Sequence, residues 1–223
     1  MWKPTKPLLL LASGLAGCAT APPPYPADLD ARLSSYASSA ACCDDPSGFA
    51  YAVLPESGTV DLVIGQSSPA FEFQSGLSRF AAFRLPDSGA PFRIRVKSFF
   101  DGPESPGGSV FYPVLAMMDE SFIVTRVSNL ENLRLEQALA TPGGETGLAV
   151  TAPFDPNISP ERYLIVFTPA ALLGAAPAER REGDVLTAPT MSWLERRGNG
   201  LVRPSPFGRI SILVAPVAPP GPG

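Results

Sequence analysis

Residues 92 to 100 read FRIRVKSFF, and this stretch decides the fold class. Apolar side chains at every second position, such as Phe92 and Ile94, alternate with the basic side chains of Arg93, Arg95 and Lys97. A period of two is typical of a β-strand that buries one face and exposes the other. We therefore expect a strand here with a charged outer face.

Ten further stretches are rich in β-branched and aromatic residues and are separated by turn clusters such as PESG and PDSGAP. They predict strands at 51–54, 60–64, 70–74, 79–85, 110–118, 122–127, 133–140, 147–154, 163–169 and 209–216. Many short strands favour an all-β fold, an antiparallel β-sandwich of jelly-roll type, over a parallel α/β sheet. We expect two β lobes, residues 46–130 and 131–216, with one continuous sandwich as the alternative.

The first seventeen residues carry the pattern of a lipoprotein signal peptide, 1–17. Lys3 and Lys6 precede an apolar run, and small residues lead to Cys18. Bacterial lipoprotein precursors are cut before such a cysteine once its thiol carries lipid, so Cys18 is the expected lipidation site. The apolar run is shorter than the ~20 residues of a membrane-spanning helix. An ordinary cleavable signal is the competing interpretation.

A lipidated chain would be attached to the membrane through its acyl chains alone. Position 19 is alanine rather than aspartate, which favours the outer membrane of a Gram-negative bacterium, on its periplasmic side. Residues 18–27 form a proline-rich spacer, and 28–45 predict one short helix and a turn. Residues 217–223 are expected to be a disordered tail.

Composition excludes several classes of function. The chain has 17 basic and 21 acidic residues and no histidine, so its formal net charge is −4. The sequence has no basic stripe of the kind that nucleic-acid binding requires, so nucleic-acid binding is excluded. Without histidine, the commonest general base and the usual zinc ligand are absent. We therefore predict a protein that is not an enzyme, with no catalytic residues, metal site or cofactor.

Two adjacent carboxylate pairs, Asp44 with Asp45 and Asp119 with Glu120, are poor candidates for catalysis. Neighbours on a strand point to opposite faces, and carboxylates in turns are usually solvated.

Several blocks of the chain, in order, resemble the maltose-operon periplasmic protein (MalM) family. They are the cysteine pair at 42–43, SSPAFEFQSGLSRFAAFRLP at 67–86, VFYPVLAMMDESF at 110–122, PERYLIVFTPAALLG at 160–174 and SPFGRISILVAP at 205–216. The resemblance covers most of the chain after the spacer. It implies an exported accessory protein of maltose and maltodextrin uptake, and it supplies no catalytic residues to transfer.

Sugar binding needs aromatic faces beside planar hydrogen-bonding groups. Trp193, followed by Arg196 and Arg197, is the first candidate in this chain. Tyr112 and Phe100, which flank the turn at 101–109, come second. The competing interpretation of these aromatic residues is packing in the core.

Two functions remain from these observations. The first is a non-catalytic binding protein of carbohydrate transport, with a malto-oligosaccharide or an envelope transport protein as its partner. The alternative is a structural or scaffolding lipoprotein that binds other proteins and no sugar.

Cys42 and Cys43 are each other's only intramolecular partners if Cys18 carries lipid. Two thiolates without histidine leave a zinc ion short of ligands, and thioredoxin-like redox chemistry uses two intervening residues. We predict a vicinal disulfide that marks a turn, with two free thiols as the alternative.

Overall fold

The strand β5 (Phe92–Asp101) lies at the centre of the structure, a computed structural model that describes residues 34, 36–101, 108–136, 145–173 and 203–217. Ile94 and Val96 are fully buried, while Arg93 and Arg95 face outward. The alternation in the sequence thus sets the inner and outer faces of the sheet around it.

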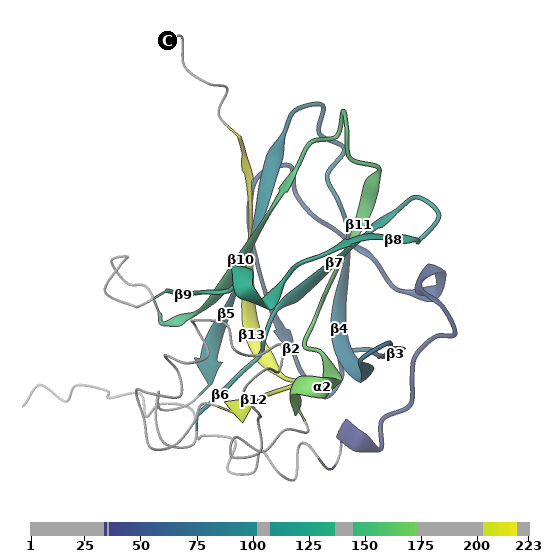
Figure 1. Cartoon of the computed structure of the whole chain (residues 1–223), viewed down its shortest axis with the longest axis vertical. Coiled ribbons are helices and arrows are strands. Elements are labelled where there is room, and N and C mark those ends of the chain that lie inside the picture. Colours follow the sequence, from purple (N-terminus) through teal and green to yellow (C-terminus); the bar gives the residue numbers. More distant parts are fainter. Residues whose placement is uncertain (1–33, 35, 102–107, 137–144, 174–202, 218–223) are drawn as a thin grey trace, which may run out of the picture.

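Two sheets make up the fold, and almost all of their strand pairs are antiparallel (Figure 1). Sheet A has the order β1 (Ala52–Val53), β4 (Gly76–Arg84), β11 (Glu161–Phe167), β7 (Val114–Asp119) and β8 (Val124–Val127), and β3 (Ala70–Phe73) pairs with β4. Sheet B contains β2 (Gly58–Ile64), β13 (Gly208–Pro216), β5, β10 (Gly147–Phe154) and β9 (Arg134–Glu136). Two short strands complete sheet B: β6 (Ser109–Val110) pairs with the end of β5, and β12 (Arg203–Pro204) pairs with β6.

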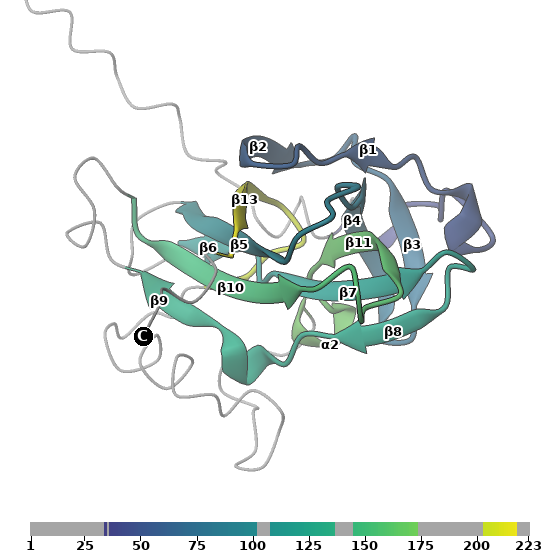
Figure 2. The ribbon, with the colours of Figure 1, turned by 90° about the horizontal axis from the view of Figure 1, so that it is seen from above.

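Short helical turns connect some of the strands. They are η1 (Pro46–Gly48), η2 (Leu130–Asn132) and α2 (Ala170–Leu173). Figure 2 shows the same arrangement from above, with β8 and β9 at the margins of their sheets.

The main core lies between the sheets and consists of buried aliphatic and aromatic side chains. Among its largest members are Phe111, Tyr112, Leu115, Leu148 and Leu164. An all-β sandwich was predicted from the sequence, and the structure confirms it. Most of its strands lie close to the predicted ones, but 110–118 is split into β6 and β7, and β12 was not predicted. Of the predicted strand 133–140, residues 137–140 lie outside the described residues.

The division into two lobes is wrong. β10 pairs with β5, β11 lies between β4 and β7, and β13 lies between β2 and β5. Each sheet therefore contains strands from both halves of the chain, and the single continuous sandwich describes the structure. Of the helix and turn predicted at 28–45, residues 28–33 and 35 lie outside the described residues, and only Ser34, Tyr36 and Ala37 are helical among the rest.

The second face of sheet A is also apolar. Along β11, Leu164 and Val166 enter the main core, while Ile165 and Phe167 point to the opposite side. The same division holds along β4 and β7, where Phe80, Ala82, Val114, Ala116 and Met118 join the second cluster. Sheet A thus has two buried faces, although a two-layer sandwich requires only one.

The outer face of sheet B is charged instead. Arg95 forms an ion pair with Glu136, and the Lys97 ammonium lies 3.5 Å from the same carboxylate. Burial and the neighbouring Arg95 lower the pKa of Lys97. Gly147 of β10, which pairs with Phe99, lies near Lys97 Cε, and its missing side chain leaves room for the Lys97 stem.

This close packing predicts the effect of adding one methyl group. A Cβ at position 147 would lie 3.1 Å from Lys97 Cε and would collide with the Ser98 carbonyl oxygen. Gly147→Ala should therefore lower the free energy of unfolding in urea by about 1–3 kcal/mol. Gly89→Ala is the matched control, because nothing lies within 4 Å of its added Cβ. Equal stability of the two variants would contradict the described packing of β10 on β5.

Candidate functional site

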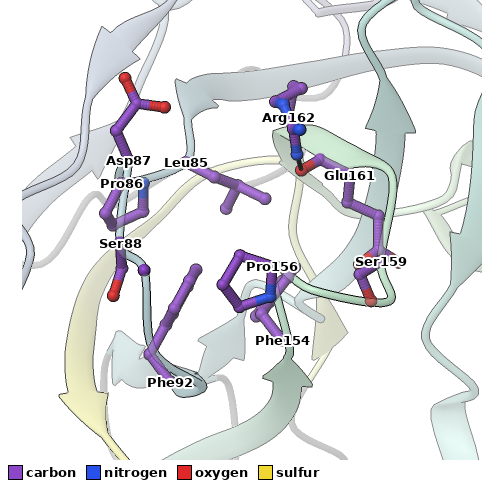
Figure 3. A pocket seen from close by; sticks show the side chains of 11 residues that line it. Leu85, Pro86, Asp87, Ser88, Phe92, Phe154, Pro156, Ser159, Glu161 and Arg162 are labelled. Carbon is purple, nitrogen blue, oxygen red and sulfur yellow. Dashed lines mark hydrogen bonds between the residues drawn. The ribbon is translucent and has the colours of Figure 1, made fainter.

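A cavity of ≈240 Å³ lies where the β4–β5 and β10–β11 connections meet at one end of the sandwich (Figure 3). Its apolar surface comes from Leu85, Pro86, Phe92, Phe154 and Pro156. Phe92 and Phe154 face each other on neighbouring strands and stack with centroids 5.2 Å apart. The stacked rings give the cavity a fixed apolar floor.

A buried carboxylate belongs to the same cavity. The Glu161 side chain is only 5 % exposed, and it accepts two hydrogen bonds from Arg126 of β8, from Nε at 2.9 Å and from a terminal nitrogen at 3.2 Å. Arg126 also donates to the Pro153 carbonyl oxygen and lies over the Phe154 ring. This two-bond pairing holds the carboxylate in one orientation.

Two exposed charged groups stand at the rim of the cavity. The Arg162 guanidinium donates one hydrogen bond to the Glu161 carbonyl oxygen, at 2.9 Å. The Asp87 carboxylate lies 3.5 Å from Arg84, and both of these side chains are well exposed. The hydroxyls of Ser88 and Ser159 complete the polar part of the lining. Acceptors and a planar donor thus surround an apolar floor, an arrangement suited to a small ligand with hydroxyl groups.

A second, larger hollow of ≈460 Å³ lies on the outer face of sheet A. We call it the aromatic groove; its lining is Pro46, Phe49, Phe71, Glu72, Phe73, Gln74, Ser75, Val114, Ala116, Met118, Val124, Val127, Ile165, Phe167 and Pro169. Phe73 stacks on Phe167 with centroids 4.3 Å apart, and Phe49 meets Phe71 edge to face at 4.9 Å. Glu72 is the one charged residue among these described lining residues.

The segment that precedes β1 covers part of this face of sheet A. Asp45 begins η1 and accepts hydrogen bonds from Ser47, which hold the pKa of its carboxyl below the usual value. The Tyr51 hydroxyl donates to the Pro46 carbonyl oxygen at 2.8 Å, and burial raises the pKa of Tyr51. Asp45 therefore organises a turn and lies apart from the cavity.

Cys42 and Cys43 form a disulfide in the structure, with their Cα atoms 3.8 Å apart. The Cys42 amide donates to the Ala70 carbonyl oxygen at 2.7 Å, and Cys43 packs against the second cluster of sheet A. The pair therefore attaches the N-terminal segment to β3, beside the aromatic groove.

The structure separates the predicted binding residues. Tyr112 is fully buried in the main core, so its assignment to sugar binding is wrong and the packing alternative describes it. Phe100 is half-buried against the same core and forms no part of either hollow. Trp193, Arg196 and Arg197 lie outside the described residues, as does Cys18.

Sequence reasoning missed Glu161 and Arg126, which are separated by 35 positions in the chain. Their pairing follows from β7, which has β11 on one side and β8 on the other, and no local pattern indicates it. Two charged residues that open an otherwise apolar strand, Glu161 and Arg162 in ERYLIVF, were the one available signal.

Within the described residues, no three cysteine or carboxylate side chains gather as metal ligands would. No helix in this described part of the chain is long and apolar enough to cross a membrane. No protein-family model matches the chain, and a search of curated proteins finds no significant match.

The cysteine pairing has a direct chemical test. In a Cys18→Ser variant unfolded without reductant, iodoacetamide should label no cysteine, and after dithiothreitol it should label two. Intact mass measures both states. Two labels before reduction would contradict the disulfide, and a dimer that dissociates on reduction would show pairing between chains instead.

Proposed function

We propose that this protein is a non-catalytic carbohydrate-binding lipoprotein of the periplasm, anchored to the outer membrane through Cys18, that assists maltodextrin uptake. The observation that carries the binding proposal is the cavity at the end of the sandwich, where Glu161, Asp87 and Arg162 stand around an apolar floor.

A glucose ring combines an apolar face with hydroxyl groups at its edge. Leu85, Pro86 and Pro156 offer surface for the apolar face. The Glu161 and Asp87 carboxylates can accept hydrogen bonds from hydroxyl groups, and a planar guanidinium can donate to ring or hydroxyl oxygens. This mixture of a mostly apolar wall and a few polar groups is typical of ligand sites.

The size of the cavity limits what enters it. A volume of ≈240 Å³ is the space of about eight waters, at roughly 30 Å³ each. This volume is below the about 300–1,000 Å³ of pockets that hold drug-sized ligands, and favours a ligand part as small as one sugar ring. We infer that the cavity holds the terminal ring of a malto-oligosaccharide whose remaining rings lie outside.

The link to maltose rests on the ordered blocks that resemble the MalM family, and the lipid anchor rests on the sequence before Cys18. Neither depends on the geometry of the cavity. Sugar binding can therefore be tested apart from localisation and from the transport pathway.

A scaffolding lipoprotein that binds other proteins and no sugar is the second candidate. The aromatic groove favours it, because an open hollow lined mostly by apolar side chains can receive a side chain or segment of another protein. Crosslinking in intact cells that captures an envelope protein, together with no response to sugar, would favour this candidate.

Calorimetry with maltoheptaose tests the carbohydrate proposal. We expect binding heat with the wild-type protein, and a roughly tenfold weaker Kd for Arg162→Ala and for Asp87→Asn, since one lost charge-assisted hydrogen bond is worth about 1.5–3 kcal/mol. Arg93→Ala is the control, because it removes an arginine that is also exposed but lies on the outer face of sheet B and does not line the cavity. No heat at millimolar maltoheptaose, or equal weakening by all three substitutions, would contradict sugar binding in the cavity.

A further inference from the structure

The strand β8 forms an open edge of sheet A. Within the described part of the chain it pairs with β7 alone, and Figure 2 shows it at the margin of its sheet. An edge strand presents unpaired backbone groups to which another strand can add. Natural proteins usually protect such edges with charged side chains, proline or a covering element.

On β8 this protection is limited to its short length and the register shift against β7. Its one charged residue, Arg126, turns toward the opposite face and pairs with Glu161. The other large side chains at this edge are apolar and exposed: Ile123 is 63 % exposed, Val124 is 52 % and Val127 is 53 %. Exposed valine and isoleucine at a free edge are a liability unless something binds there.

The edge is continuous with the aromatic groove. Val124 and Val127 both line the groove, although residues three apart on a regular strand point to opposite faces. The register shift between Met117 and Met118 on β7 lets them share one face. A strand added at β8 would therefore place alternate side chains next to the groove.

The β7–β8 turn holds this edge in place. Ser121 and Ile123 donate their amides to Asp119 Oδ1 at 2.9 and 3.0 Å. Phe122 adopts a positive φ of 60° and stacks on Tyr163, with centroids 4.7 Å apart. A preformed edge reduces the entropy lost when a partner strand binds.

The negative charges around the aromatic groove and β8 favour a partner with basic residues. Glu72 lines the groove, Asp44 and Asp45 directly precede its Pro46 wall, and Glu120 and Glu131 lie in the connections on either side of β8. The cation nearest in sequence, Arg126, is already paired. The surface is thus apolar with an acidic margin.

We propose that β8 and the aromatic groove bind an extended segment of another protein, with alternating apolar residues and basic residues at its ends, as an added strand. A second copy of this chain fits poorly, because pairing β8 with β8 would bring the two acidic margins together. The aromatic groove shares no lining residue with the sugar cavity, although Arg126 of β8 pairs with Glu161 of that cavity. The inference does not depend on the proposed function.

A designed peptide provides the probe. A fluorescein-labelled peptide of sequence KKVTVTVTVKK carries the required alternation and basic ends, and anisotropy measures its Kd for the full-length protein. Val124→Lys and Val127→Lys should each weaken binding at least tenfold, because a cation replaces an apolar contact at the edge. Val63→Lys is the matched control: it is 65 % exposed, lies on β2 of sheet B and should change the Kd less than twofold.

Two peptide variants separate strand addition from simple apolar or charge attraction. Methylation of alternate backbone nitrogens removes donors needed for pairing, and glutamate in place of the lysines reverses the end charges; each should weaken binding at least tenfold. Amide exchange at 124–127 should slow when the original peptide binds. Circular dichroism verifies that each protein variant is folded.

Failure of the original peptide to bind at 1 mM would overturn the inference, as would equal weakening by Val63→Lys or full binding of the methylated peptide. Maltoheptaose titration of Val127→Lys separates this inference from the proposed function. Unchanged sugar heat with lost peptide binding supports two sites. If the wild-type protein binds the peptide but gives no heat with maltoheptaose, this inference is supported and the carbohydrate proposal is contradicted.

Discussion

The constraint on which the rest of the structure depends is that β4, β7 and β11 are apolar on both faces. One face packs against sheet B and forms the main core, and the other would be left to water. The segment from Cys42 to Tyr51 and the strand β3 therefore cover part of the second face. Their cover is incomplete, and the aromatic groove is the part that remains open.

The two outer faces of the sandwich differ because the strands of sheet A are apolar on both faces. Sheet B carries a charged outer face with ion pairs at Arg95 and Arg209, as expected of a surface that meets water. Sheet A carries aromatic side chains there instead. A protein that keeps an aromatic layer on an outer face loses solubility unless that layer is covered or binds something. The aromatic groove therefore lies on the outer face of sheet A. The cavity lies at the end of the sandwich, where the strand connections of both sheets meet.

Much of the fold could be predicted because alternation and turn residues are local signals. The alternation in FRIRVKSFF predicts an inner and an outer face, and the burial of β5 follows it from Phe92 to Val96. Lys97, which the alternation places on the exposed face, is buried instead. The stretch at 110–118 was harder: its apolar run is continuous, but Pro113 has no amide to donate, and the chain leaves one sheet as β6 and enters the other as β7.

The site could not be predicted in the same way, because its parts are distant in sequence. Glu161 meets Arg126 only after β7 has paired with both β8 and β11, and the stack of Phe92 on Phe154 needs the register of β5 and β10. The two-lobe prediction failed for the same reason. Tyr112 was misassigned because an aromatic residue near a turn can face either way.

The central claim is that the cavity between the β4–β5 and β10–β11 connections recognises a sugar. A crystal structure of the protein grown with maltoheptaose tests it most directly. The account predicts a terminal glucose ring against Pro86 and Pro156, within hydrogen-bond distance of Glu161 or Arg162. A sugar chain bound in the aromatic groove, or a cavity filled by water alone at saturating sugar, would contradict it.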